Sequence, residues 1–219
     1  MTRCLVMPDA HLHLPLLVTI DAILQNPAYQ IDAVVSLGDW CDDWDALTRD
    51  YQYFFDEFLS RIADSPVPYY LCWGNHDYGY QYDHGFSGKN PYAIRYVKSR
   101  LRRLHSLSPI RPFFRDANTI FSHAGISQAA HDRCPDHDFP DLWEDDSPLW
   151  GRPTYTLTET YDPTILQVVG HTPIATVTYN PHTNMLYTDT WSETPTHIPI
   201  GDRTLVIVDT VTQKWEVIG

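Results

Sequence analysis

Five short segments of the chain contain side chains that bind metal ions, and each follows a run of apolar residues. In chain order the segments are Asp9-Ala10-His11, Gly38-Asp39-Trp40-Cys41-Asp42, Gly74-Asn75-His76-Asp77, Ser122-His123-Ala124-Gly125 and Gly170-His171-Thr172. The apolar runs before them cover residues 4–7, 33–37, 69–73, 119–121 and 166–169. Such runs are typical of buried strands. We therefore expect the polar residues to lie at strand ends, where open α/β sheets place their sites.

The donor types in these segments suit a pair of first-row metal ions. Carboxylate and amide oxygens favour hard divalent and trivalent cations, and imidazole nitrogen suits Zn, Fe and Mn. Asp39 could bridge two ions with its two carboxylate oxygens. Two ions about 3.5–4 Å apart can hold a phosphate and polarise a bridging water into hydroxide, in line with the phosphorus. The donor set therefore predicts phosphoester hydrolysis by metal-bound hydroxide, without a covalent enzyme intermediate.

His76 and Asp42 are the candidate acid–base pair. The alkoxide that leaves a phosphomonoester needs a proton. His76 follows Asn75 directly, so its side chain can face the substrate when Asn75 points at the metals. Asp42 comes three residues after Asp39, which could return it to the same rim, where it would orient the imidazole and raise its pKa.

The order of the five segments is more informative than any one of them. Short motifs such as Asp-x-His or Gly-His-Thr recur by chance, and a lone histidine at a strand end is often structural. Chance would have to supply all five after strand-like runs. The ordered set therefore favours a metal centre over a purely structural domain.

Length and charge narrow the class of protein further. A chain of 219 residues with 43% hydrophobic residues is expected to form one domain over residues 1–219. The formal net charge of −13 argues against a general nucleic-acid or anionic-membrane surface. No apolar stretch approaches the roughly 20 residues that span a bilayer, so we expect a cytoplasmic protein. Four cysteines form no CxxC pair, and Cys41 stands out only because it lies within the second segment.

The first half of the chain predicts strands alternating with helices, which is typical of a mainly parallel sheet. Apolar spacing predicts helices over residues 14–25 and 45–63, and a basic amphipathic helix over residues 91–107. The basic face could be merely solvated or could recognise an acidic substrate. Residues 78–90 resemble a lid or substrate edge. Their alternating Tyr78, Tyr80 and Tyr82 could stack a nucleobase or form a strand-like hairpin.

The second half turns to β character after an acidic loop over residues 131–150. Short strands are predicted at residues 176–179, 185–188, 204–208 and 214–218, separated by turn residues. A second sheet packed on the first would account for them.

These motifs resemble the calcineurin-like metallophosphoesterase superfamily over nearly the whole chain. Gly170-His171-Thr172-Pro173 and Leu149-Trp150-Gly151-Arg152 look most like its bacterial and phage phosphoprotein-phosphatase and symmetrical diadenosine-tetraphosphatase branch. The resemblance implies an α/β fold of two mixed β-sheets, packed as a sandwich and flanked by helices. It also implies two divalent or trivalent metal ions, with Mn expected first and Fe or Zn as alternatives.

The resemblance assigns roles to individual residues. It implies that one ion is bound by Asp9, His11 and Asp39, and the other by Asp39, Asn75, His123 and His171. It also implies that His76 and Asp42 donate the proton and that Arg152 grips the substrate phosphate.

Two departures from the branch concern the substrate. The branch usually has Arg-Gly after its second motif and Glu at the end of its third, whereas this chain has Asp43-Trp44 and Asp77. A carboxylate at position 43 would repel the phosphate that an arginine clamp binds. A distant cation could compensate, or the substrate could meet this edge with a neutral or cationic group. The candidate cations are Arg102, Arg103, Arg111 and Arg115, and the roles of His13 and His84 stay open between supporting the site and facing solvent.

The sequence predicts a phosphoric ester hydrolase whose partner is a phosphorylated substrate, either a phosphopeptide or a nucleotide. A serine/threonine-protein-phosphatase-like phosphomonoesterase is the first interpretation. A nucleotide or dinucleoside polyphosphate hydrolase is the alternative. A third hypothesis, from another class, is a metal-binding scaffold without catalysis; it would be marked by loss of a ligand or of the proton donor.

Overall fold

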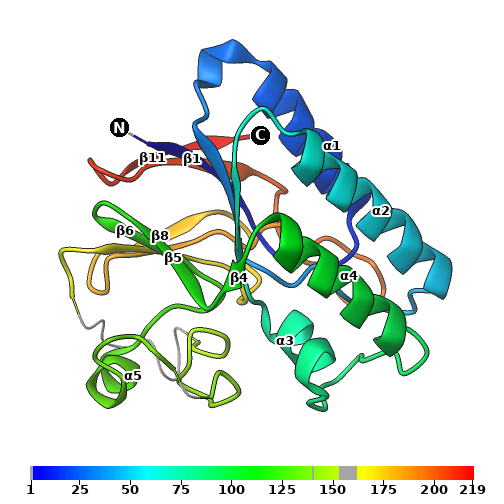
Figure 1. The fold of residues 1–219 in the computed structure, drawn as a ribbon. Coiled ribbons are helices and arrows are strands. Elements are labelled where there is room, and N and C mark those ends of the chain that lie inside the picture. Colours follow the sequence, from blue (N-terminus) through cyan, green and yellow to red (C-terminus); the bar gives the residue numbers. More distant parts are fainter. Residues whose placement is uncertain (1, 140, 153–161) are drawn as a thin grey trace.

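A computed structural model describes residues 2–139, 141–152 and 162–219 and contains two mixed β-sheets with helices around them (Figure 1). The first sheet has the strand order β11-β10-β1-β2-β3-β4, and the second has the order β5-β6-β7-β9-β8. The first sheet consists of β1 (Arg3–Met7), β2 (Ala33–Ser36), β3 (Tyr69–Cys72), β4 (Ile110–Arg111), β10 (Leu205–Asp209) and β11 (Lys214–Ile218). The second consists of β5 (Phe113–Asp116), β6 (Thr119–Ser122), β7 (Leu166–Val169), β8 (Thr178–Asn180) and β9 (Met185–Tyr187). The predicted fold class is confirmed.

Each sheet contains a parallel set of strands with an antiparallel edge. In the first sheet β1, β2 and β3 run parallel, and β10 pairs with β1 in the antiparallel sense. In the second sheet β6, β7 and β9 run parallel, and β5 and β8 flank them in the antiparallel sense. Because parallel strands end at a common edge, the segments that follow them are brought together.

The apolar runs are continuous because both faces of the first sheet are covered. In β1, Cys4 and Val6 join the core between the two sheets, together with Val168 and Leu186 of the second sheet. The alternate residue Leu5 belongs to the core under the helices. A strand buried on both faces has no polar face, so its sequence shows no alternation.

Helices α1 (Leu14–Gln25), α2 (Thr48–Asp64) and α4 (Ile94–Leu107) lie along one side of the first sheet (Figure 1). The range predicted for α1 is confirmed, and α2 begins three residues later than predicted. Its start is set by Asp50, whose Oδ2 accepts the backbone N–H of Leu47 at 2.8 Å. Shorter helical elements are η1 (Pro27–Tyr29), α3 (Asn75–Tyr82) and α5 (Gln128–Arg133).

Two local expectations were wrong. The alternating tyrosines lie in α3 and not in a strand-like hairpin, so Tyr80 is buried while Tyr82 is half exposed. The last two strands, β10 and β11, join the first sheet and not the second. All five residues of β10 are buried, so it fits an interior place between β1 and β11. Across the described residues, no helix has the length and apolar character needed to cross a bilayer.

Candidate functional site

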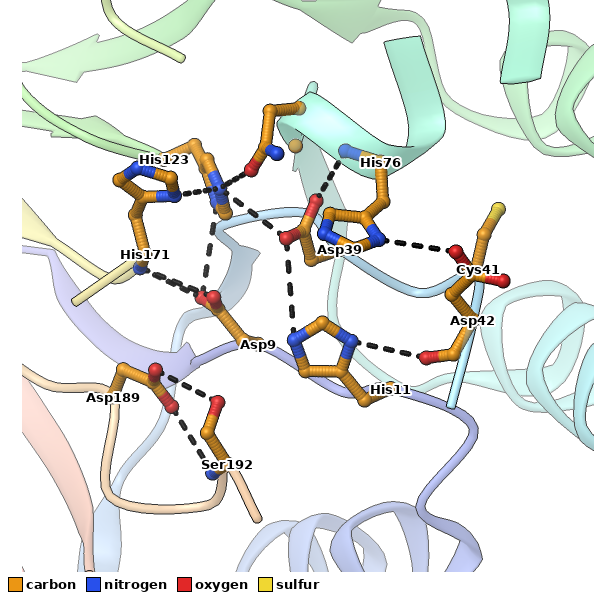
Figure 2. Close-up of polar contacts among 12 residues, drawn as sticks. Asp9, His11, Asp39, Cys41, Asp42, His76, His123, His171, Asp189 and Ser192 are labelled. Carbon is orange, nitrogen blue, oxygen red and sulfur yellow. Dashed lines mark hydrogen bonds and ion pairs between the residues drawn. The ribbon is translucent and has the colours of Figure 1, made fainter. Parts of the chain in front are cut away.

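The five sequence segments follow the carboxyl ends of β1, β2, β3, β6 and β7, and their side chains converge (Figure 2). They border a cavity of about 360 Å³. The cavity is lined by Asp9, His11, Asp39, Asp42, Asn75, His76, Arg152 and His171, among others. His123 lies beneath this lining with no exposed surface.

The loops at these strand ends have unusual backbone conformations. His11, Asp39, Asp42 and His171 have φ angles of 38°, 47°, 75° and 62°. Residues other than glycine seldom adopt this left-handed region, and such strain is concentrated at functional sites. Tertiary packing therefore holds these four side chains in place against local backbone preference.

Glycines let two of the loops approach closely. A Cβ atom on Gly38 would lie 2.2 Å from the backbone nitrogen of Gly74, and one on Gly74 would lie 2.1 Å from Oδ1 of Asp39. Any side chain at either position would push the loops after β2 and β3 apart. This close approach explains why a glycine stands directly before the polar residue in both the second and the third segment.

Asp39 lies at the centre of the cluster. Its Oδ1 accepts the backbone N–H of His76 at 2.9 Å. Its Oδ2 lies 3.4 Å from Nε2 of His123 and 4.0 Å from Nε2 of His11. Two groups of side chains each offer three potential ligand atoms that lie within 4.8 Å of one another. The first group is His11, Asp39 and His76, and the second is Asp39, His123 and His171. Asp39 belongs to both groups, which is the position that a bridging carboxylate requires.

Hydrogen bonds to carbonyl groups orient two of the imidazoles. Nδ1 of His11 lies 3.0 Å from the Asp42 carbonyl oxygen, and Nδ1 of His123 lies 3.1 Å from that of Leu37. A carbonyl oxygen can only accept, so each Nδ1 carries the proton and each Nε2 presents a lone pair. Nε2 of His123 in turn lies 2.7 Å from Oδ1 of Asn75. The lone pairs of His123 Nε2 and Asn75 Oδ1 therefore lie close together, as two ligands of one cation would.

Asp9 joins the cluster from β1. Its two carboxylate oxygens each lie 3.1 Å from the backbone nitrogen of His171 and accept its N–H. Oδ1 of Asp9 is also 3.8 Å from Nδ1 of His123. Asp9 therefore contacts the backbone of His171 and the imidazole of His123, which both follow strands of the second sheet.

Burial shifts the protonation of the cluster in a consistent way. It raises the pKa of Asp39 to about 7 and also raises that of Asp9, with the Asp189 and Asp39 charges adding to the effect on Asp9. It lowers the pKa of His11 to about 4 and lowers that of His123. Buried carboxylates and neutral imidazoles of this kind are the environment that a cation would stabilise.

The residues fit a metal centre on a further observation. Nε2 of His171 is buried and has no hydrogen-bond partner among the residues that the structure describes, while Nδ1 of His171 lies 3.0 Å from Nε2 of His123. A buried polar atom without a partner is unfavourable unless a ligand satisfies it. Oxygen and imidazole donors in this combination suit first-row metal ions.

His76 and Asp42 form a pair at the edge of the cavity. Nδ1 of His76 donates to Oδ2 of Asp42 across 3.1 Å. Burial opposes protonation of His76, but the carboxylates of Asp39 and Asp42 outweigh burial and raise its pKa. The phenyl ring of Phe86 lies 4.5 Å from the imidazole, centroid to centroid. One side of the imidazole is thus fixed, and the residue also lines the cavity.

Asp77 binds backbone groups of two loops. Its Oδ1 accepts the N–H groups of Trp40 and Cys41, each at 3.0 Å, and its Oδ2 lies 3.3 Å from the nitrogen of Gly74. Asp77 is fully buried. It therefore joins the second segment to the start of α3. Cys41 is likewise fully buried, and burial raises the pKa of its thiol well above the usual value, so it is a packed structural thiol.

The structure separates the other candidates. Among the described residues, the candidate arginines at 102, 103, 111 and 115 are exposed and do not line the cavity, whereas Arg152 does. His13 lines the cavity and lies 3.5 Å from Oε1 of Glu193. His84 stacks on Trp143 with ring centroids 4.5 Å apart and lies outside the lining.

Sequence reasoning missed Asp189. It is buried and follows β9, the next parallel strand, and burial raises its pKa to about 6. Its carboxylate accepts from the backbone N–H and hydroxyl of Ser192 at 3.2 and 2.8 Å. Ser192 and Glu193 line the cavity. The apolar run before Asp189 was the available signal, because it matches the runs before the five segments.

A family model described as Calcineurin-like phosphoesterase matches residues 2–199. The chain belongs to the calcineurin-like phosphoesterase family. As a member of this family, the protein is a metal-dependent phosphoester hydrolase, and its family implies divalent metal ions. The paired ligand groups around Asp39 agree with that membership.

Solved structures support the calcineurin-like fold at low sequence identity. A cold-active protein-tyrosine phosphatase of a psychrophile, Shewanella sp., has a TM-score of 0.63 and 14% identity, covering 100% of this chain and 81% of the other. A protein serine/threonine phosphatase from Saccharomyces cerevisiae has 0.58 and 9%, covering 99% and 79%. A metallophosphoesterase from Sphaerobacter thermophilus has 0.52 and 17%, covering 99% and 87%. A search of curated proteins gave no significant match.

Proposed function

We propose that this phosphoesterase is a phosphomonoesterase that acts on phosphorylated side chains of proteins, like the serine/threonine protein phosphatases. The position of Asp39 in both ligand groups, beside the His76–Asp42 pair at the edge of one cavity, carries the proposal. The motifs at residues 149–152 and 170–173, which resemble the phosphoprotein-phosphatase branch, support it. The chain acts as one domain, since both sheets contribute to the centre.

The ligand assignment follows the family resemblance of the five segments. One ion would be held by Asp9, His11 and Asp39, and the other by Asp39, Asn75, His123 and His171, which agrees with the groups His11–Asp39 and Asp39–His123–His171. We propose Mn for both, with Fe and Zn as the ions that the same donors would also bind. When bound, such ions stabilise charge on the phosphoryl group and lower the pKa of a water that attacks phosphorus.

The chain's own residues provide proton transfer and orientation. Water adds to phosphorus as the bond to the leaving oxygen breaks, and His76 gives its proton to that oxygen. The products are an alcohol, inorganic phosphate and a neutral imidazole. Asp42 orients the imidazole through Nδ1, which leaves Nε2 for the substrate. Arg152 binds a phosphate oxygen from the cavity wall.

The charges around the cavity favour a substrate with a single phosphate. Asp43 and Glu193 line the cavity, and their carboxylates would repel the additional phosphates of a dinucleoside polyphosphate. Glu193 pairs with Arg203, and His197 lies 3.5 Å from Glu193 and 3.8 Å from Asp43. A neutral or cationic leaving group therefore fits this edge better than an anionic one.

Aromatic residues in the lining support a second candidate, nucleotide hydrolysis. Trp44, which is 40% exposed, and Phe86 line the cavity and could stack a base. Tyr80 and Tyr82 do not take this role, because Tyr80 is buried and Tyr82 lies outside the lining. A nucleoside monophosphate fits both features, because its base could stack on the aromatic lining and its single phosphate limits repulsion from the carboxylates of Asp43 and Glu193.

Metal analysis of the purified protein followed by an activity screen with added Mn²⁺ tests the proposal. The substrates are phosphoserine and phosphothreonine peptides, nucleoside monophosphates and dinucleoside polyphosphates. We expect two ions per chain and the highest kcat/KM for a phosphopeptide. Higher kcat/KM for nucleotides would support the second candidate. Two bound ions with no turnover of any substrate would indicate a scaffold and would overturn the proposal.

A further inference from the structure

Asp42 has a second set of partners on the side away from His76. Its Oδ1 accepts the hydroxyl of Tyr51 at 2.8 Å and that of Tyr80 at 2.7 Å. Its Oδ2 accepts from His76 at 3.1 Å. Both tyrosines are fully buried, and only 3% of Asp42 is exposed. Three protein donors thus hold a carboxylate that is nearly shielded from water.

The Tyr80 hydroxyl has a further contact besides Asp42. The backbone N–H of Asn90 donates to the Tyr80 hydroxyl oxygen at 2.8 Å. The oxygen thus accepts from Asn90, and because a carboxylate oxygen accepts, the hydroxyl proton is donated to Asp42. The two hydroxyl oxygens are 3.4 Å apart, so both phenols can donate to the same carboxylate oxygen. An ionised carboxylate, which can only accept, is the partner that this arrangement suits.

The same contacts connect Asp42 to the loop at the cavity edge. Asn90 ends residues 83–90, of which Phe86, Ser87 and Gly88 line the cavity. Lys89 fastens this loop to α3, because its Nζ donates to the carbonyl oxygens of Gly79 and His84 at 3.0 and 2.8 Å. Tyr80 is thus a common contact of the loop and the Asp42–His76 pair.

We propose that Tyr51 and Tyr80 are positioning residues that hold Asp42, and through Asp42 hold His76, in the orientation for proton donation. The proposal rests on the proposed role of His76 as the proton donor. Neither tyrosine lines the cavity, so both act through Asp42 and not on the substrate. Asp42 has a backbone φ of 75°, so its own backbone preference does not hold it there. The two hydroxyls supply that restraint.

The Tyr51→Phe and Tyr80→Phe variants, alone and combined, test this role. Each removes one hydroxyl and keeps the buried ring. We expect the double variant to keep the wild-type metal content. We expect its kcat to fall about 10-fold for phenyl phosphate and phosphoserine peptide, whose leaving groups need a proton, and to change little for 4-nitrophenyl phosphate. His76→Ala is the benchmark, with a loss of about 100-fold or more on the poor leaving groups.

Tyr69→Phe is the matched control, because Tyr69 is also a buried tyrosine but lies at the start of β3, away from Asp42. It should behave like wild type on all esters. An equal loss for good and poor leaving groups in the tyrosine variants would indicate a purely structural role and would overturn the proposal. Wild-type rates on the poor leaving groups would also overturn it. If the double variant does not fold, the two single variants decide by the same comparison.

A readout without turnover separates this proposal from the proposed function. A wild-type protein that hydrolyses none of the esters would refute the phosphomonoesterase. The positioning role would then be decided by crystal structures of wild type and the double variant. Side chains of Asp42 and His76 that leave their wild-type orientation in the double variant would support the role, and unchanged side chains would overturn it.

Discussion

At the scale of single residues, Asp39 connects the two ligand groups. Its Oδ1 is held by the backbone N–H of His76, and its Oδ2 faces the imidazoles of His11 and His123. The φ angle of 47° at Asp39 is stabilised by the surrounding packing and not by its own preference. A change at this side chain therefore affects both halves of the proposed centre.

Asp39→Asn should lower the metal content of the purified protein from two ions per chain to one or none. An amide has one oxygen acceptor where the carboxylate has two and carries no charge. Elemental analysis after dialysis measures the change. Asp43→Asn is the control, because Asp43 lies at the rim and should leave the metal content unchanged. A variant at position 39 that retained two ions would contradict the bridging assignment.

Asp43→Arg should strengthen binding of phosphomonoesters, lowering KM by about 10-fold through one charge-assisted contact to phosphate. The Asp43 side chain is 22% exposed at the cavity rim, so a longer side chain has room to turn toward the cavity. Steady-state kinetics with a phosphoserine peptide measure the change. Asp136→Arg, on the surface outside the cavity lining, serves as the control for net charge. An equal change in KM for both variants would rule out a local effect.

At the scale of elements, Asp77 holds the loop after β2 against the start of α3. Three backbone N–H groups that the strand and helix leave without partners are satisfied by this one carboxylate. Asp77 stands where the phosphoprotein-phosphatase branch that the motifs resemble usually has Glu. The shorter side chain still reaches both loops because Gly38 and Gly74 let their backbones approach.

Asp77→Ala should reduce the free energy of unfolding by about 3 kcal/mol, because it leaves buried backbone donors without acceptors. Asp50→Ala is a matched control, since Asp50 also accepts a backbone N–H at the start of a helix but is exposed. It should cost about 1 kcal/mol. Urea denaturation in the presence of a chelator measures both without a metal contribution. Equal costs would contradict the bridging role of Asp77.

At the scale of the whole molecule, the proposed centre spans both sheets. Asp39 and Asn75 follow strands of the first sheet, while His123 and His171 follow strands of the second. The two sheets also share an apolar core. Ions bound between them would therefore stabilise the packing of one sheet on the other as well as supply the chemistry.

Removal of metal should therefore lower the thermal midpoint. An ion that binds the folded chain stabilises it by about 2.7 kcal/mol when its free concentration is 100 times its dissociation constant. Calorimetry of the chelated protein with and without added Mn²⁺ measures the shift. Asp39→Asn should show a smaller shift, and the exposed-site variant Asp50→Ala should show the full one. Identical midpoints with and without Mn²⁺ would contradict a centre that links the sheets.

Local patterns predicted the strands before the five segments, the strands of the second half and the three longest helices, but not β4, β5, α3 or α5. An apolar run indicates a buried strand, and the end of the run indicates where a polar loop begins. Residues that are neighbours in sequence are therefore enough to predict these features. The helix at residues 14–25 is the clearest case. The structure also brings the six proposed ligands together, as the ends of parallel strands require.

Tertiary structure alone decided what depends on residues far apart in the chain. It placed β10 and β11 in the first sheet, added Asp189 to the buried cluster, and excluded the four distant arginines from the cavity lining among the described residues. It also brought the hydroxyls of Tyr51 and Tyr80 within hydrogen-bonding distance of Asp42. Hydrogen bonds and charge interactions join residues that are distant in sequence, whereas apolar periodicity is a property of residues that are neighbours in sequence. The sequence therefore determined the kind of chemistry, and the fold decided which side chains orient it.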